Sequence, residues 1–431
     1  MLRANDVGGW TKPAPRLYPH QWSWDSAFIA IGLAHLDPSR ALEELEHLFK
    51  AQWTDGRVPH IVFDPNVPEY WPGPDLWGSR DVSAAPTTVA TSGLIQPPMH
   101  AIAVWRILEI ARTERVSETV MRDLVARSRA LYPRLLAWHR YLAERRDAER
   151  TGLITVYHPW EGTDNTPRWD AALAMIEVGE LPPYPRTDVS LVDASERPTK
   201  AEYDRYLWLV GLLRAAKYDD EVVQTVHPFL IKDVQCSAIF VAANDALAQI
   251  AKLADAPARE RAAIAEWSKH SAEGVRACWD HDLELALDFD LRAHRPIRCV
   301  TSAGLCPVLV PSLTRAEARR FLDRIFGPDF AGAEGLAFPV VLSTGARTSE
   351  FRPRAYWRGP TWPVINWLLW CGLRAHGIES EAARLREANL ALLARPGARF
   401  SEYFEPFTAE PLGSHDQSWT AAVALDWIAA G

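Results

Sequence analysis

The strongest constraint on the fold is a helical periodicity that recurs along nearly the whole chain in adjacent pairs. Apolar residues return every three to four positions with charged residues on the opposite side, as in helices that bury one face. Short turns such as Asp37-Pro38 separate the members of a pair. We therefore expect about eleven or twelve helices. The periodic segments are residues 26–36, 41–53, 100–112, 117–146, 201–217, 235–253, 257–278, 311–325, 360–375, 379–393 and 415–430.

Long segments rich in proline and aromatic residues lie between the helix pairs, at residues 58–79, 156–198 and 334–359. They are too long to be plain connections, so we interpret them as functional loops. Strand signals are few and short, for instance at residues 340–343. No linker or fixed-period repeat divides the chain. We predict one all-α domain over residues 1–431, a closed ring of helix pairs with loop insertions at about 58–79 and 156–198 gathered at one mouth.

The chain is unusually rich in tryptophan, with 19 among 431 residues. Its 48% hydrophobic and 24% charged residues are otherwise ordinary for a globular protein. A buried indole needs a partner for its N–H group, which makes tryptophan a costly core residue. The excess is typical of proteins that stack on sugars, and large core side chains are the plainer explanation.

The net charge of −8 and the lack of a basic stripe argue against nucleic-acid binding. An anionic ligand would need local arginines. The longest apolar stretch, residues 364–373, is too short to span a membrane. Five cysteines without a CxxC pattern indicate buried thiols in a reducing compartment, and no His/Cys/Asp cluster has metal-ligand spacing. We expect a cytoplasmic protein without metal or cofactor; a homo-oligomer stays open.

Residues 158–170 place three acidic side chains, Glu161, Asp164 and Asp170, close to two tryptophans, Trp160 and Trp169. A carboxyl group among indole rings is poorly solvated, so its pKa rises. Such a group can still carry its proton near neutral pH, as an acid catalyst must. Flat aromatic faces beside it suit a sugar ring. The alternative is an acidic loop held by ion pairs with Arg168.

A second aromatic motif, residues 18–25, directly precedes a predicted helix. It offers Tyr18, Trp22 and Trp24 as a stacking surface, with Asp25 at the position of a helix N-cap. The Asp25 side chain could either cap the helix or bind a ligand, and the sequence does not decide between these two roles. His60 reads equally as a half-buried histidine and as a ligand for a sugar hydroxyl.

Two further motifs lie at residues 351–362 and 400–419. The first contains Tyr356 and Trp357, and the second contains Glu402 and Glu405, each of which alone reads more readily as a solvated charge. All four motifs lie in loops that precede helices, and such loops converge at one end of a ring. An acid from one loop and a base from another are what glycoside hydrolysis requires.

Together these motifs resemble glycoside hydrolase family 63, above all its short bacterial members that hydrolyse mannosylglycerate and glucosylglycerate. The resemblance spans nearly the whole chain. It implies an (α/α)6 barrel and an inverting mechanism with Asp164 as general acid and Glu402 as general base. The family often has Glu-Ser-Gly where this chain has Trp160-Glu161-Gly162, so we assign Glu161 no role.

The resemblance also implies a set of substrate-binding residues. Asp25 is expected to help place the attacking water, and Arg197 to bind a glycerate carboxylate, unless it forms a surface salt bridge with Glu196 or Glu202. The implied residues are Tyr18, Trp22, Trp24 and Asp25 for the sugar; Gln96, Tyr356, Trp357, Gly359 and Trp362 elsewhere in the pocket; and Tyr70, Arg197, Tyr203 and Gln417 for glycerate, with His60 beside them.

The expected function is hydrolysis of a small anionic glycoside, an α-linked hexosyl-glycerate, and the sequence leaves mannose and glucose open. Alternatives are another family 63-like α-glucosidase or trehalase-type hydrolase, a sugar epimerase or lyase using His60 as base, and a non-catalytic sugar-binding protein. Prenyl cyclases share Gln-Trp pairs such as Gln21-Trp22, but the Asp-rich motif that they need is missing.

Overall fold

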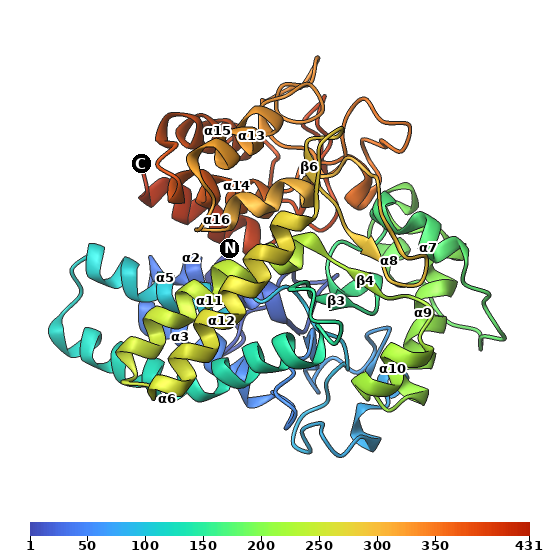
Figure 1. Ribbon diagram of the computed structural model, residues 1–431, viewed down its shortest axis with the longest axis horizontal. Helices are drawn as coiled ribbons and strands as arrows, with labels where there is room; N and C mark the ends of the chain where they lie inside the picture. The colour runs from blue at the N-terminus through green and yellow to red at the C-terminus, as the bar shows by residue number, and fades with distance from the viewer.

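A computed structural model describes residues 1–431, and long helices dominate it (Figure 1). All eleven predicted helical segments are confirmed, with their ends shifted by a few residues. The long helices are α2 (Ser23–Ala34), α3 (Pro38–Lys50), α5 (His100–Thr113), α6 (Glu118–Arg145), α9 (Lys200–Ala215), α11 (Val234–Leu253), α12 (Ala258–Ala277), α13 (Arg315–Ile325), α14 (Pro363–Ala375), α15 (Glu379–Leu393) and α16 (Ser418–Ala429).

Several helices begin where the sequence supplies an N-terminal cap. The Asp37 carboxylate accepts hydrogen bonds from the backbone N–H groups of Ser39 (3.0 Å) and Arg40 (3.1 Å), ahead of Pro38 in the first turn of α3. Thr199 and Glu202 form a reciprocal capping box at the start of α9. These side chains satisfy backbone donors that the helix itself leaves unpaired, so they set the helix starts.

Six buried elements contact one another in a closed circuit: α2, α5, α11, η5 (Ser302–Leu309), α14 and α16, which returns to α2. The helix that follows each of the first five in the chain packs against it: α3, α6, α12, α13 and α15. The short α1 (Leu2–Asn5) contacts α16, so the two ends of the chain meet.

The element η5 was not predicted. It is a 3-10 helix of eight residues that contains Pro307, and all eight residues are buried. A segment that is apolar on every side has no polar face, and therefore no helical periodicity for the sequence to show. At Gly304 an added Cβ would lie 2.6 Å from the carbonyl oxygen of Ala286, so this buried position requires glycine.

The remaining elements are short and gather with the long loops on the right of Figure 1. The predicted strand at residues 340–343 is wrong, because only Leu342 forms a single bridge there, to Thr361. The short helices are α4 (Pro74–Trp77), α7 (Asp170–Ala174), α8 (Asp188–Leu191) and α10 (Asp220–Val226). The two-residue strands are β1 (Gln21–Trp22), β2 (Ile61–Val62), β3 (Thr155–Val156), β4 (Ile231–Lys232), β5 (Trp279–Asp280), β6 (Leu285–Ala286), β7 (Phe289–Asp290), β8 (Arg295–Pro296), β9 (Tyr403–Phe404) and β10 (Pro411–Leu412).

All strand pairs are antiparallel, and they anchor the loops close to the helix starts. One sheet has the order β3-β4-β7-β8; the other pairs are β1-β2, β5-β6 and β9-β10. In the β1-β2 pair Gln21 lies opposite Val62, and in the β9-β10 pair Tyr403 lies opposite Leu412. These two pairs fix the backbone next to two of the motifs that the sequence singled out.

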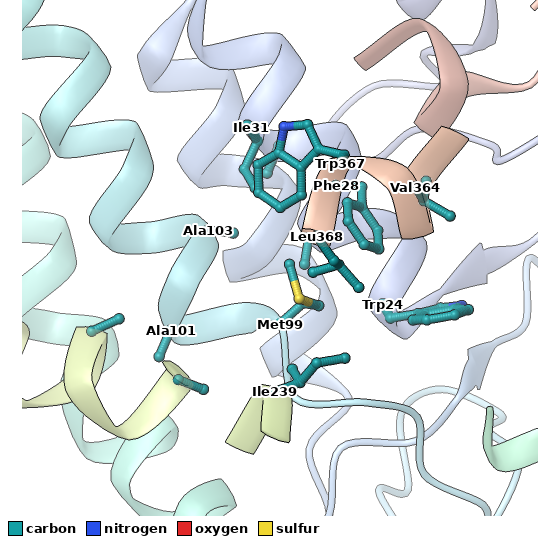
Figure 2. Packing of buried hydrophobic residues seen from close by; sticks show 14 of the residues in the cluster. Trp24, Phe28, Ile31, Met99, Ala101, Ala103, Ile239, Val364, Trp367 and Leu368 are labelled. Carbon is teal, nitrogen blue, oxygen red and sulfur yellow. The ribbon is translucent and has the colours of Figure 1, made fainter. Parts of the chain in front are cut away.

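The largest hydrophobic core contains 75 buried residues and fills the space between the ring elements. Figure 2 shows Phe28 of α2, Met99 before α5, Ile239 of α11 and Trp367 of α14 converging there. By length and composition α11 could cross a membrane, but 78% of its most apolar window is buried inside the fold. Its apolar side chains therefore serve the core.

The five cysteines are all free. Cys236 and Cys306 are buried, as predicted, whereas Cys278, Cys299 and Cys371 are only half-buried. The prediction that all five are buried is thus wrong for three of them.

The crossing of α2 and α16 depends on a glycine. A Cβ added at Gly32 would lie 2.4 Å from the Cα of Ala422, whereas one added at Gly211, on the exposed side of α9, meets nothing within 4 Å. We predict that Gly32→Ala lowers the free energy of unfolding by about 1–3 kcal/mol through overpacking. Gly211→Ala, the matched control, should raise it by about 1 kcal/mol.

Denaturant unfolding of the two variants and the parent protein measures both changes. If Gly32→Ala were as stable as Gly211→Ala, the close approach of α2 and α16 would be wrong.

Candidate active site

The predicted loops converge on one cavity of about 370 Å³, a volume ordinary for a small-molecule site. Half of its 30 lining residues are hydrophobic, and they come from both predicted loop insertions and from the starts of α2 and α16. Of the predicted site residues, its wall contains Tyr18, Trp22, Trp24, Asp25, His60, Tyr70, Gln96, Asp164, Arg197, Tyr203, Tyr356, Trp357, Glu402 and Gln417.

Two residues that were expected in the pocket, Trp362 and Gly359, do not line the cavity. Trp362 lies behind the wall and stacks on Trp357 with ring centroids 3.7 Å apart. The backbone N–H of Gly359 donates to Ser343 Oγ at 2.9 Å, and a Cβ there would lie 2.5 Å from the carbonyl oxygen of Arg352. Both residues support the wall, and their predicted part in binding substrate stays a prediction.

The Glu402 carboxylate is buried and held at both oxygens. Oε1 accepts hydrogen bonds from the hydroxyls of Tyr18 (2.8 Å) and Tyr356 (3.3 Å), and Oε2 accepts one from the N–H of Ser414 (2.9 Å). Burial raises the pKa of Glu402, while Arg197, Ser414 and Tyr18 oppose that rise. With 1% of Glu402 exposed, its interpretation as a solvated charge is wrong.

The backbone beside Glu402 leaves no room for a side chain. Gly413 has φ of 68°, and a Cβ there would lie 2.7 Å from Glu402 Oε2. Glycine is therefore required both by the left-handed conformation and by the close approach to the carboxylate.

Asp25 lies in the first turn of α2 and is not its cap. The helix begins at Ser23 after Trp22, and no side chain caps it, so the capping interpretation of Asp25 is wrong. Burial raises the pKa of Asp25 well above its usual range, and the charge of Glu402 raises it further. Because Arg197 and three hydrogen-bond donors stabilise the anion of Glu402, we expect Glu402 to ionise before Asp25.

Asp164 is presented by a tight turn between η2 (Pro159–Glu161) and η3 (Pro167–Trp169). Asn165 adopts φ of 59°, which asparagine tolerates, and its N–H donates to the Tyr206 hydroxyl at 3.0 Å. The N–H of Trp357 donates to Asn165 Oδ1 at 3.3 Å. Burial raises the pKa of Asp164 to about 7; Arg197 lowers it and Glu402 raises it. Near neutral pH this group can therefore give or take a proton.

The alternative role of this loop, an acidic segment held by Arg168, is wrong. Arg168 pairs instead with Asp288 and with Asp233, the latter at 3.2 Å. Asp170 pairs with Arg358. Asp164 is thereby left facing the cavity.

Glu161, to which no role was assigned, ties three segments together. Its carboxylate accepts both guanidinium N–H groups of Arg146, at 2.8 and 2.9 Å, and neither side chain is more than 1% exposed. It also accepts the N–H groups of Ile95 (3.0 Å) and Tyr157 (2.6 Å). The buried Arg146–Glu161 pair links the Asp164 loop to the backbone next to Gln96. No local sequence pattern could reveal this link, because its members lie far apart in the chain.

Arg197 lies inside the cavity, with 9% of its side chain exposed. Its Nη1 donates to the Tyr18 hydroxyl at 3.3 Å, and its guanidinium lies 4.3 Å from the centre of the Tyr356 ring. Its ionic partner is Asp188, with Nε 3.5 Å from Oδ2. The alternative of a surface salt bridge with Glu196 or Glu202 is wrong. Asp188 is a cavity residue that the sequence analysis missed.

The rest of the wall combines aromatic rings with a few polar groups. Tyr18 and Tyr70 meet Trp22 edge-on, at 5.2 and 5.8 Å between ring centroids. Gln96 Oε1 accepts the N–H of Trp24 at 3.1 Å. Burial lowers the pKa of His60 well below its usual value, so its imidazole is neutral.

No three His, Cys, Asp or Glu side chains are grouped to hold a metal ion.

Buried carboxyl groups with raised pKa values and an aromatic wall around one cavity are the features of a glycoside hydrolase. The chain belongs to the family described as the mannosylglycerate hydrolase MGH1-like glycoside hydrolase domain, whose model matches residues 18–420.

Characterised relatives cover the whole chain. It is 45% identical to the glucosylglycerate hydrolase of Mycolicibacterium hassiacum, over 99% of this chain and 96% of that protein. It is 40% identical to the mannosylglycerate hydrolase of Thermus thermophilus, over 99% and 98%. A crystal structure of a family GH63 mannosylglycerate hydrolase from Thermus thermophilus, in complex with Tris and D-glycerate, superposes with a TM-score of 0.89, at 39% identity over 99% of this chain and 98% of that one.

The raised pKa of Asp164 makes a prediction about stability. Because the pKa is about 7 in the folded protein against a usual 3.8, the folded state keeps a proton that the unfolded chain loses. The contribution of Asp164 to the free energy of unfolding of the wild type should therefore fall as pH rises from 4 to 7. Asp164→Asn cannot ionise, so the melting temperature of the variant minus that of the wild type should rise over this range and level off above it.

Thermal unfolding at a series of pH values measures the difference, with Asp75→Asn at an exposed carboxyl as the matched control. A pH-independent difference for Asp164→Asn would contradict the raised pKa.

Proposed function

We propose that this protein hydrolyses α-linked hexosyl-glycerates, mannosylglycerate and glucosylglycerate, to the hexose and glycerate with inversion at the anomeric carbon. One observation carries the proposal: Asp164, Glu402 and Arg197 lie on the wall of a single buried cavity. Hydrolysis of an anionic glycoside needs an acid, a base and a cation, and these residues supply them. Of the two relatives named above, one is a glucosylglycerate hydrolase and the other a mannosylglycerate hydrolase.

We propose further that the scaffold is a single-domain (α/α)6 barrel over residues 1–431, with insertions at about 58–79 and 156–198. The support is the closed circuit of six buried elements, five of which pack against the helix that follows them in the chain. Because η5 takes one of the six places, this barrel would contain a 3-10 segment in its inner ring. The five free cysteines support action in the cytoplasm.

On the leaving-group side of the sugar, Asp164 donates its proton to the glycosidic oxygen as the bond to the anomeric carbon breaks. Its pKa of about 7 keeps much of it protonated near neutral pH, so the proton is available for donation to the leaving oxygen. The turn through Asn165, and the hydrogen bond that its N–H donates to the Tyr206 hydroxyl, hold the loop that carries Asp164.

In the same displacement, Glu402 accepts a proton from a water that attacks the anomeric carbon from the opposite face. The hydroxyls of Tyr18 and Tyr356 fix its carboxylate, and Arg197 favours its anion. Asp25 lines the cavity beside it and gives the water a second polar neighbour. With a water in this position Glu402 would act on the water and not on the sugar, which would give inversion.

The two parts of the substrate meet different residues. We place the hexose against Trp22, Trp24 and Gln96, whose amide N–H groups are left to donate to hydroxyls. We place the glycerate at Arg197, whose guanidinium forms two parallel hydrogen bonds to a carboxylate, with Tyr70, Tyr203 and Gln417 around it.

A sugar epimerase is the less supported alternative. Its base would have to be His60, whose Nδ1 is bonded to Ser92 Oγ and whose pKa is held low by burial, which weakens it as a base. The relatives named above are hydrolases.

If Asp164 is the acid and Glu402 the base, variants of the two residues should respond differently to a change of the leaving group. Asp164→Asn should lower kcat/KM for a hexosyl-glycerate by about 10²–10⁴-fold. With the α-hexosyl fluoride, whose leaving group needs no proton, the loss should be much smaller. The fall in wild-type activity above pH 7 should then be absent from the variant. Glu402→Gln should lose activity on both substrates, because water is attacked in both reactions.

Steady-state rates over a range of pH, with Asp75→Asn as control, measure these effects. Equal losses for Asp164→Asn on both substrates, or near-normal hydrolysis by Glu402→Gln, would contradict the assigned roles.

A further inference from the structure

Two cations share one carboxylate at the edge of the cavity, in a segment where no sequence motif stood out. Arg186 Nε donates to Asp188 Oδ1 and its Nη2 donates to Oδ2, both at 2.8 Å. On the other side, Arg197 Nε lies 3.5 Å from the same Oδ2. Asp188 is thus paired closely with Arg186 and loosely with Arg197.

Arg186 is held in this position by further contacts. Its Nη2 also donates to the carbonyl oxygen of Pro198 at 2.9 Å. Its guanidinium lies 4.2 Å from the centre of the Tyr203 ring. Asp188 and Arg197 line the cavity, but Arg186 does not, so it acts on the site from behind.

The charge of Asp188 is a problem for an anionic substrate. Burial raises its pKa, but Arg186 and Arg197 outweigh that effect and hold the pKa below its usual value, so the group stays ionised. Glu402 already places a negative charge in the same cavity. An uncompensated Asp188 would repel a glycerate carboxylate next to Arg197. The bidentate pair with Arg186 removes that repulsion.

We propose that Arg186 and Asp188 are specificity-determining residues for an anionic aglycone. Arg186 neutralises Asp188, and Asp188 binds the Nε edge of Arg197, which orients the guanidinium. The trio then carries one net positive charge, which Arg197 presents to the glycerate carboxylate. This inference rests on the proposed function, since it concerns the residues behind the glycerate site.

The test compares a charged and a neutral substrate of the same shape. These are a hexosyl-glycerate and the corresponding hexosyl-glycerol, in which CH2OH replaces the carboxylate. Arg186→Gln should raise KM for the hexosyl-glycerate about tenfold, with kcat within about twofold, and leave KM for the hexosyl-glycerol unchanged. Arg186→Lys should keep much of the wild-type KM because it keeps the charge.

A second variant distinguishes the electrostatic effect of Arg186→Gln from any effect of that substitution on the structure of the loop. The double variant Arg186→Gln with Asp188→Asn restores the net charge of one and should recover most of the KM for the hexosyl-glycerate. Lys200→Gln is the matched control, because it removes a nearby cation that pairs with Asp204 and not with Asp188. Equal KM increases on both substrates, or no recovery in the double variant, would overturn the inference.

Binding of D-glycerate alone, measured by calorimetry, keeps this test independent of hydrolysis. Arg186→Gln should weaken it about tenfold, and the double variant should restore it. If the wild type bound D-glycerate but hydrolysed neither substrate, the proposed function would fail while the charge trio could still be judged. Unchanged D-glycerate affinity in Arg186→Gln would overturn the trio.

Discussion

The rest of this structure depends on one constraint, the burial of three carboxyl groups around a single cavity. Asp164, Asp25 and Glu402 all line that cavity, and burial raises the pKa of each. Their neighbours then separate them. Glu402 receives two tyrosine hydroxyls, a backbone N–H and the field of Arg197, whereas only the field of Arg197 and its own backbone N–H lower the pKa of Asp164. The same desolvation thus produces an acid and a base from chemically similar groups.

The helical ring supplies the rigidity that such a cavity demands. Buried carboxyl groups are stable only while their donors stay in place, because an unpaired buried charge is very costly. The β9-β10 pair and Gly413 fix the backbone on both sides of Glu402, and the Arg146–Glu161 pair fixes the loop of Asp164. The site is therefore built from loops whose ends are locked to helices and short strands.

The long helices and most of the candidate site residues could be predicted from the sequence. Amphipathic helices show a regular spacing of apolar residues, and four aromatic loop motifs contained the candidate residues. What stayed hidden has physical reasons. The segment η5 is apolar on every side and so lacks a period. Asp188 and Glu161 act through partners distant in sequence or behind the wall. The stacking of Trp362 behind the wall stayed hidden because a tryptophan that supports a wall and one that lines it share the same local pattern.

The most direct test of the account is the anomeric form of the first product. Proton NMR of the purified protein with mannosylglycerate, and separately with glucosylglycerate, resolves the free hexose in the first minutes, before mutarotation mixes its anomers. A water activated by Glu402 opposite Asp164 predicts that the β-anomer appears first from the α-linked substrate. Early α-anomer would contradict this account by making Glu402 a nucleophile, and no release of hexose would contradict the proposed hydrolysis itself.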